Sequence, residues 1–526
     1  MTRSTLGPTS ALVAATLTAA LALTTVPAGA ATSRTLRAAH RSAAPGETRA
    51  TRAARDLVAS SSRWDAALSR PRRDDFYPSH GSRVVDALHY GLDLTWHRST
   101  RRLVGHETVV LRAAHSARRF SLELEHGLDV RRARLDGRPV HVSHVGHRVR
   151  FRAPLTAGTR HVVTIGYAGH PHPVAAPTRR GDFSTVGLTT TGNGSIWTMQ
   201  EPFGAYTWYA VDDQPADKAF YDFRISAPGS WVGIANGALL RRYHRHGRTI
   251  TRFHLGVPSA SYLTTLAVGA YRHTVLHALP HLPIHLWTEK GKAWELHRMR
   301  FVPKAVRFLQ HQVGRYPFGT LGMVAVPSNS AMETETIPTM GDNKFVLTQD
   351  NIVHELAHQW YGDTVTPSDW SDVWMNEGMA LYLAEGRWQS QHFGFALRKE
   401  LHSWAQQAPS WRREWGAPAA YDRRDFAEIN VYAIPALMWD MLRERVGHHR
   451  FDRLIAQWPA DRRHASSSRA DLAAWWSRHT GQDLGHFFHK WLLAKREPSW
   501  HRGGSARPML GDGVRPWFTR PGNLPR

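Results

Sequence analysis

The stretch from Val353 to Tyr382 constrains this chain more than any other, because it carries histidine and glutamate at a spacing that suits a metal ion. His354 and His358 are four residues apart, so a helix over 352–360 would place both imidazoles on one face, about one turn apart. Glu377 follows on a second apolar segment. Two histidines and one glutamate form an established zinc ligand set that leaves a fourth position open for water. We therefore expect one Zn²⁺ per chain, bound by His354, His358 and Glu377.

Glu355 neighbours the first histidine without being needed as a ligand. Its carboxylate can reach the attacking water, which predicts a general base. The pentapeptide H-E-x-x-H can also arise by chance in a chain that has 33 histidines among 526 residues. A different zinc pattern, H-E-x-x-H-x-x-G-x-x-H, is excluded because Tyr361 and Thr364 stand where it requires the glycine and the third histidine.

Three short runs extend the motif: H-E-L-A-H-Q-W from His354 to Trp360, then Gly362-Asp363, then W-M-N-E-G from Trp374 to Gly378. Together they resemble the zinc-binding core of the M1 family of aminopeptidases, which are gluzincins. The resemblance implies a zinc hydrolase that removes N-terminal residues from peptides. It also implies an α+β multidomain fold, in which an N-terminal β domain precedes a thermolysin-like, mostly helical catalytic domain. A chain of this length would be a short bacterial-type member without the C-terminal helical domain of larger relatives.

The resemblance further implies carboxylates that bind the free ammonium group of a peptide substrate. Ser330-Ala331-Met332-Glu333-Thr334 stands in the place of the family's G-A-M-E-N motif. Glu333 is the expected ammonium ligand, and the backbone at Ser330 and Ala331 is expected to line the substrate as an added strand would. Because Ser330 replaces glycine and Thr334 replaces asparagine, we expect the substrate preference to be affected.

Two further site residues follow from the same resemblance. Glu201, in Met199-Gln200-Glu201-Pro202, is the expected second ammonium anchor, and Gln200 is a candidate for substrate contact. Tyr432 matches the family's catalytic tyrosine, whose hydroxyl donates to the oxyanion that forms in the reaction. Tyr421 is its nearest rival for that role.

Apolar periodicity divides the chain in the same order. From 74 to 275, short runs with alternating apolar and polar residues, such as 88–96, are separated by turn residues and predict a mainly antiparallel β domain. From 276 to 500 the period becomes helical, as in 294–313, where Pro303 should kink or restart the helix. The Ala- and Arg-rich segment 31–73 is expected to be a disordered linker or propeptide, and 501–526 a loose tail.

The first 30 residues predict a secretory signal. Arg3 precedes an apolar run over 11–23 and a small-residue site at Ala28-Gly29-Ala30, so cleavage is expected after Ala30. That run is too short to span a membrane, and no later segment is apolar enough, so we expect a secreted protein without a transmembrane segment. Because the chain has no cysteine, disulfides and thiol mechanisms are excluded and the metal ligands must be histidine and carboxylate.

The formal net charge of +24 comes from arginine spread through every segment, without a dense basic block or an aromatic recognition motif. We therefore expect no nucleic-acid partner and at most a loose association with an anionic cell envelope. Two other functions fit the same residues: a zinc metallo-endopeptidase that cuts internal bonds, and a basic, envelope-binding secreted protein with an inactive zinc site.

Overall fold

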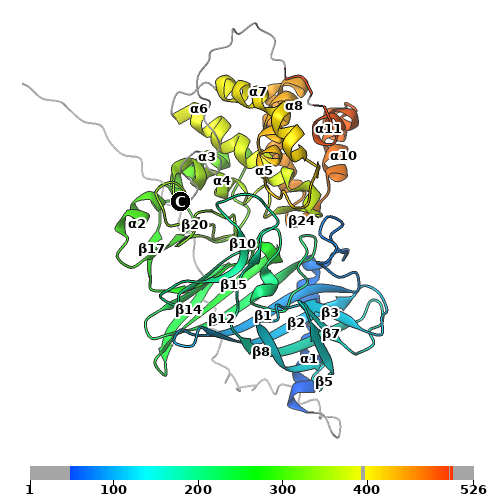
Figure 1. Cartoon of the computed structure of the whole chain (residues 1–526), viewed down its shortest axis with the longest axis vertical. Helices are drawn as coiled ribbons and strands as arrows, with labels where there is room; N and C mark the ends of the chain where they lie inside the picture. Colours follow the sequence, from blue (N-terminus) through cyan, green and yellow to red (C-terminus); the bar gives the residue numbers. More distant parts are fainter. Residues whose placement is uncertain (1–47, 393–396, 497, 501–526) are drawn as a thin grey trace, which may run out of the picture. The chain divides into compact units, whose positions relative to one another are not determined.

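The computed structural model describes residues 48–392, 397–496 and 498–500. The predicted signal (1–30), the predicted linker as far as residue 47 and the predicted tail (501–526) lie outside the described residues. From Thr48 onward the chain forms one compact unit, in which a β-rich part precedes a mostly helical part (Figure 1). The predicted α+β fold is thereby confirmed. In the part of the chain that the structure describes, no helix has the length and apolar character to cross a membrane.

An eight-stranded sheet dominates the β-rich part, in the order β14-β15-β12-β1-β2-β8-β4-β5 (Figure 1). Buried and partly exposed residues alternate along the second half of β1, as the predicted period of two requires. β1 and β12 pair in parallel, with His89 opposite Phe220, and the other neighbours in this sheet are antiparallel. The strands are β1 (Val85–His97), β2 (Arg102–Ala113), β4 (Leu128–Leu135), β5 (Arg138–Pro139), β8 (Arg160–Gly169), β12 (Lys218–Pro228), β14 (Ala238–Arg245) and β15 (Arg248–Ala260).

Two smaller antiparallel sheets complete the β-rich part. One has the order β13-β16-β11-β10-β9 and the other β3-β7-β6. Their buried side chains belong to one hydrophobic cluster that also includes the large sheet and the helices. The elements are β3 (Phe120–Glu123), β6 (Val142–Val145), β7 (Arg148–Phe151), β9 (Val174–Ala175), β10 (Thr185–Thr190), β11 (Ile196–Met199), β13 (Val232–Ala235) and β16 (Leu266–Gly269), with 3₁₀ turns η2 (Ala205–Thr207) and η3 (Ser261–Leu263).

The prediction of a disordered linker is wrong for residues 48–73. They form α1 (Arg49–Ala59) and the 3₁₀ helix η1 (Ser61–Ala67), and Thr48 caps α1 by accepting a hydrogen bond from the Thr51 amide. A small buried cluster on the large sheet contains Ala54, Trp64, Ala67, Leu88, Val110 and Val162. Alanine and arginine, taken as signs of disorder, are also strong helix formers, and a few apolar residues anchor the helix to the sheet.

A four-stranded sheet, β17-β18-β19-β20, opens the helical part. Its strands are β17 (Tyr271–Leu276), β18 (Ile284–Glu289), β19 (Leu321–Val326) and β20 (Thr339–Gly341). The predicted boundary at residue 275 falls inside β17, which pairs with β18 along its whole length, so the boundary lies before Tyr271. The alternation of apolar and polar residues along a strand does not show which sheet the strand joins, so the sequence did not place this boundary correctly.

Helices make up most of the remaining chain. α2 (Ala293–Met299) and α3 (Val302–Val313) are separate, with Pro303 in the first turn of α3, which confirms the predicted restart. The other helices are α4 (Gln349–Ala357), η4 (Trp370–Asp372), α5 (Trp374–Leu381), the π-helix η5 (Tyr382–Trp388), α6 (Gln389–His392), α7 (Leu397–Trp415), η6 (Ile429–Val431), α8 (Ala433–Val446), α9 (His448–Asp461), α10 (Arg469–Thr480) and α11 (Gly485–Leu492). Short strand pairs join β21 (Val365–Pro367) to β24 (Ala465–Ser467) and β22 (Gly416–Ala417) to β23 (Ala420–Tyr421).

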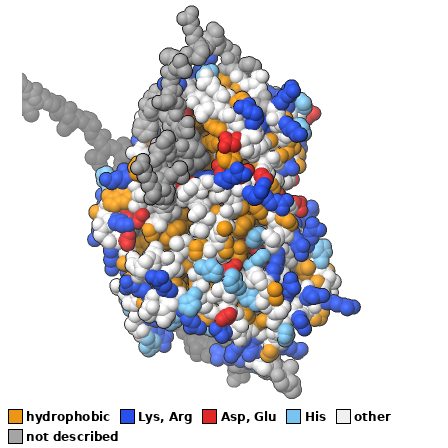
Figure 2. Space-filling view, in the orientation of Figure 1, with side chains coloured by type: hydrophobic (Ala, Val, Ile, Leu, Met, Phe, Trp, Pro, Cys, Tyr) orange, Lys and Arg blue, Asp and Glu red, His pale blue; other side chains and the backbone are white. Residues whose placement is uncertain are grey.

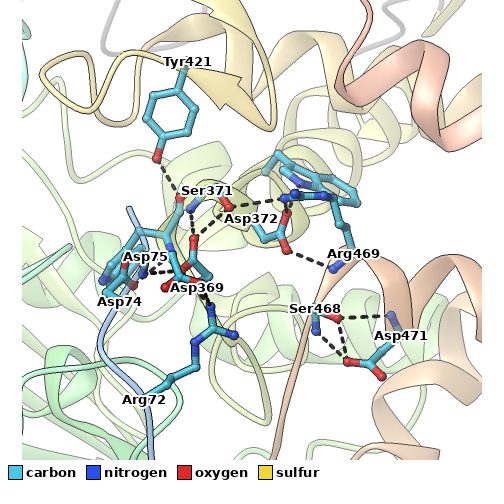
Figure 3. Close-up of polar contacts among 12 residues, drawn as sticks. Arg72, Asp74, Asp75, Asp369, Ser371, Asp372, Tyr421, Ser468, Arg469 and Asp471 are labelled. Carbon is cyan, nitrogen blue, oxygen red and sulfur yellow. Dashed lines mark hydrogen bonds and ion pairs between the residues drawn. The ribbon is translucent and has the colours of Figure 1, made fainter. Parts of the chain in front are cut away.

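A polar network fixes the turn between α4 and α5 against the segment that precedes the large sheet (Figure 3). The buried carboxylate of Asp74 accepts hydrogen bonds from two backbone amides of its own turn and, at 3.2 Å, from the Trp370 amide. Asp369 lies 3.1 Å from the guanidinium of Arg72. On the other side of the turn, Asp372 pairs at 2.9 Å with Arg469 of α10. Since α5 begins directly after this turn, the network sets where α5 starts.

We expect Asp74→Ala to destabilise the fold, because it removes the acceptor of three backbone amides, two of them in buried hydrogen bonds. A buried donor left without an acceptor costs about 1–3 kcal/mol, so the free energy of unfolding should fall by several kcal/mol. Chemical denaturation followed by tryptophan fluorescence measures the change. Asp75→Ala is the matched control, since the Asp75 side chain is 71% exposed and pairs only with Arg72 through its carboxylate. Equal stability of the two variants would contradict this role of Asp74.

The same carboxylate predicts a pH dependence. Burial and then the neighbouring Asp369 carboxylate raise the pKa of Asp74 from 3.8 to about 7. An acid with a raised pKa in the folded state stabilises the fold below its unfolded pKa and loses that contribution as the pH rises through the folded pKa. Relative to wild type, Asp74→Asn should therefore be less destabilising at pH 8 than at pH 5 in urea titrations. A difference that stays constant with pH would contradict the raised pKa.

Candidate metal centre and active site

The structure brings the three predicted zinc ligands together. His354 lies in α4, His358 caps the C-terminal end of α4, and Glu377 lies in the first turn of α5. One carboxylate oxygen of Glu377 lies 3.2 Å from Nε2 of His354 and 3.4 Å from Nε2 of His358. All three side chains are buried, and their ligand atoms lie within 4.8 Å of one another. Three donors converging in this way fit one zinc ion.

The surroundings of His358 also fit a metal ligand. Its Nδ1 lies 3.0 Å from the backbone carbonyl oxygen of Tyr361, so Nδ1 carries the proton and the lone pair of Nε2 faces the other ligands. The carbonyl reaches this position because the chain turns at Gly362, where φ is +140°. An added Cβ at Gly362 would lie 3.3 Å from Nδ1 of His358, so the motif's glycine both permits the turn and clears the ligand.

Close packing of α5 on α8 positions Glu377 relative to Tyr432. A Cβ at Gly378 would lie only 2.3 Å from the Cβ of Pro435, so only glycine permits this approach of the two helices. Tyr432 precedes the first turn of α8, and its ring centroid lies 6.1 Å from that of His354. The sequence W-M-N-E-G therefore supplies a ligand and, one residue later, the close contact that brings the tyrosine to the metal site.

The metal ligands form one wall of a cavity of about 300 Å³. Both parts of the chain line it: segments 180–186 and 197–201 come from the β-rich part, and segment 327–333 with the zinc motif comes from the helical part. Ser330, Ala331, Glu333, Glu355 and Tyr432 all lie on its surface, as does Glu201. Tyr421 does not line the cavity, and its hydroxyl donates to the Trp370 carbonyl at 2.7 Å, so Tyr432 is the tyrosine at the site.

Glu355 lies among the other acidic groups of the site. A carboxylate oxygen of Glu355, one of Glu333 and a ring nitrogen of His358 lie within 4.8 Å of one another. Burial raises the pKa of Glu355, and the charges of Glu333 and Glu377 raise it further, against the opposite effect of His358. A buried carboxyl group with a raised pKa beside an open metal position is suited to accept a proton from water and to return it.

Glu201 and Glu333 come from different parts of the chain and meet beside the metal ligands. Their carboxylates lie within 4.8 Å of that of Glu377. Each has an oxygen, Oε1, that is buried and has no hydrogen-bond partner among the described residues. Burial and neighbouring carboxylates raise the pKa of Glu201, and burial raises that of Glu333. Unpaired buried carboxylates are costly, so this corner of the cavity is suited to a cation that donates hydrogen bonds.

Gln200 lines the cavity, and contacts within the β-rich part hold its side chain. Its side-chain amide donates to the Ser261 carbonyl and to the Thr264 hydroxyl, both at 2.8 Å, and accepts from Trp208 at 2.8 Å. These contacts hold the side chain inside the β-rich part, fully buried. Gln200 therefore fixes the backbone next to Glu201, and its contact with substrate stays a prediction.

Residues that the sequence analysis did not identify support the site. Gln359 donates to the Glu333 carbonyl at 3.0 Å and to the Asp363 carboxylate at 2.6 Å, which connects the end of α4 to the segment between β19 and β20 that contains Glu333. Lys218, at the start of β12, donates to the Asp363 carbonyl at 2.7 Å. Gln359 and Asp363 stand within the recognised motif, which could have indicated them. Nothing in the sequence around Lys218 indicates this long-range contact.

Comparisons with known proteins agree with this geometry. Residues 299–491 match the family model described as the peptidase family M1 domain. Aminopeptidase N of Streptomyces lividans is 27% identical over 336 residues, which are 56% of this chain and 38% of that protein. Aminopeptidase 2 of Candida albicans is 25% identical over 57% of this chain and 34% of that protein. The chain thus spans little more than a third of the length of these curated relatives.

Solved structures show the same fold over a greater length. An M1 zinc metallopeptidase from Deinococcus radiodurans superposes with a TM-score of 0.71 at 24% identity, over 82% of this chain and 99% of that one. A mutant of it, bound to a Tyr-Ser-Ala substrate, gives the same TM-score at 23% identity, over 81% of this chain and 98% of that one. Residues 299–491 therefore match the catalytic domain of the M1 family and contain a buried His-His-Glu cluster, and the fold is shared with a two-domain M1 zinc metallopeptidase over almost all of that protein.

Proposed function

We propose that this protein is a zinc aminopeptidase that removes single residues from the N-terminus of peptides. The observation that carries the proposal is the pair of carboxylates of Glu201 and Glu333, each with a buried oxygen beside the metal ligands that has no partner among the described residues. The terminal ammonium group of a peptide offers a positive charge and three N–H donors, which these oxygens need. An enzyme that cuts internal bonds would place an uncharged peptide group there. The relatives named above as aminopeptidases support the same assignment.

The reaction follows from where the groups lie. Zinc bound by His354, His358 and Glu377 would supply a Lewis acid that polarises a carbonyl and activates water. Glu355 takes a proton from the attacking water and returns it to the leaving amine. Tyr432 donates its hydroxyl proton to the oxygen that becomes negatively charged.

Substrate alignment comes from the other wall of the cavity. With the ammonium group held by Glu201 and Glu333, the first peptide bond would lie beside the three residues that would hold the metal. The backbone of Ser330 and Ala331 lines the cavity beside Glu333, where an extended peptide can pair with it. Binding energy from the N-terminus is thereby used to orient the bond that breaks.

We propose that the protein is secreted, because residues 1–30 have the pattern of a secretory signal. We also propose a loose attachment to an anionic cell envelope, because the net charge is +24. Lys and Arg side chains are spread over both the helical and the β-rich parts of the face shown in Figure 2 and do not gather in one patch there. Such a distribution favours weak, non-specific attraction.

A purely structural zinc role is disfavoured because structural sites are normally closed by four ligands, and this one has three with Glu355 beside it.

Glu355→Gln should lower kcat for aminoacyl anilides by roughly 10²–10⁴-fold, the usual contribution of a general acid–base group, while zinc content stays at one per chain. Glu414→Gln, on the exposed side of α7, is the matched control. A chelator should abolish wild-type activity and zinc should restore it, with zinc measured by atomic absorption. Activity that persists without metal would contradict the proposal.

Free-amine aminoacyl anilides should be hydrolysed far faster than the same anilides with an acetylated amine. Glu333→Ala should lower kcat/KM for the free amine by at least about 30-fold, since removing one partner of a buried charge pair costs about 2–5 kcal/mol. The acetylated substrate should be affected much less. Equal wild-type rates on the two substrates would indicate an endopeptidase instead.

A further inference from the structure

Arg180, in the loop between β9 and β10, makes a contact with Tyr432 that no motif in the sequence indicates. Its NH1 group donates to the Tyr432 hydroxyl oxygen at 3.0 Å and to the Ala427 carbonyl at 3.0 Å. The Arg180 side chain is 6% exposed and lines the same cavity as the metal ligands. A residue of the β-rich part thus contacts the tyrosine that the proposed reaction uses.

Asp182 holds the guanidinium group in a fixed orientation. Its two carboxylate oxygens accept from Nε of Arg180 at 2.9 Å and from NH2 at 2.6 Å. Ser330 in turn donates its hydroxyl to Asp182 at 3.0 Å. A planar guanidinium bound at two points by a carboxylate has little freedom to rotate. Ser330, which stands where the family motif has glycine, therefore connects the substrate-lining segment to Arg180.

The loop that carries Arg180 is also attached to the segment before Tyr432. The Phe426 amide donates to the Pro177 carbonyl at 2.9 Å, and the Arg179 amide donates to the Glu428 carboxylate at 3.3 Å. The Arg179 side chain forms an ion pair with Asp425 at 2.9 Å. The position of Arg180 relative to Tyr432 is thus also set by contacts of the neighbouring residues, in addition to its own side-chain bonds.

The direction of the hydrogen bond has a chemical consequence. A guanidinium group has no acceptor, so the Tyr432 oxygen must accept in this contact, and its own proton points away from Arg180. A hydroxyl that accepts a hydrogen bond from a cation becomes a better donor through polarisation. Both effects favour donation from Tyr432 to a substrate oxygen that gains negative charge.

We propose that Arg180, fixed by Asp182, is a positioning residue that orients the Tyr432 hydroxyl toward the oxyanion of the reacting peptide bond. The inference rests on the proposed aminopeptidase function and adds a residue from the β-rich part to its active site. The donors of Arg180 that contact Asp182, Ala427 and Tyr432 are directed at protein groups, so its effect is on the chemical step more than on substrate affinity.

A double-mutant cycle on kcat tests this coupling, with Arg180→Met, Tyr432→Phe and the combined variant assayed on an aminoacyl anilide. We expect Arg180→Met alone to lower kcat at least tenfold with less than a threefold change in KM. In the Tyr432→Phe background the same substitution should lower kcat less than twofold. Arg180→Lys should recover part of the activity, because it keeps a cationic donor. Arg131→Met, on β4 of the large sheet, is the control: its side chain is 63% exposed, and near wild-type kcat is expected.

Equal losses of kcat from Arg180→Met in both backgrounds would overturn the inference, because they would show a role that does not pass through Tyr432. An increase in KM with unchanged kcat would also overturn it, since it would assign Arg180 to substrate binding. Thermal melting and zinc content are measured for every variant, and if Arg180→Met does not fold, Asp182→Asn takes its place under the same criterion. A wild-type enzyme inactive on anilides would contradict the proposed function itself, whereas an active enzyme with additive losses would contradict only this inference.

Discussion

The convergence of His354, His358 and Glu377 on one point is the interaction on which the rest of this structure depends. The pitch of α4 alone brings the two histidines together. Glu377 belongs to a second helix, α5, whose start is set by the polar turn between α4 and α5. Gly378 then lets α5 touch α8 at Pro435. One helix contact therefore determines both the third metal ligand and the distance to Tyr432.

The site concentrates negative charge in a buried place. Glu201, Glu333, Glu355 and Glu377 lie close together, and the cost of burying them is visible in the raised pKa values of the first three. Glu377 differs, since the neighbouring histidines hold its pKa at about 2 against the effect of burial. A dication and a substrate ammonium group would offset such charge, so the proposed sites for both lie at the point where the protein's own electrostatics are least favourable.

Most of the fold could be predicted from periodicity, because strand and helix each impose their own spacing on the apolar residues. The strand around 88–96 lies as predicted, and the helical spacing over 294–313 corresponds to α2 and α3. Composition was a poorer guide over 48–73, where Ala and Arg form a helix held by Trp64 and its neighbours. The hydrogen bonds of Gln200 could not be predicted either, because adjacency to Glu201 in sequence does not fix the direction of a side chain.

The sequence by itself determined the metal chemistry. His354, Glu355 and His358 lie within one helical turn or so, and Glu377 follows within a recognisable motif, so their relation depends on local geometry and on a resemblance that short runs carry. Only the tertiary structure decided what stands opposite the metal. Arg180, Asp182 and Glu201 are more than 130 residues from Glu333 or Tyr432 in the chain, and their contacts arise from the docking of the β-rich part on the helical part. Such contacts have no characteristic spacing in the sequence, because they depend on how the surfaces of the β-rich part and the helical part fit together.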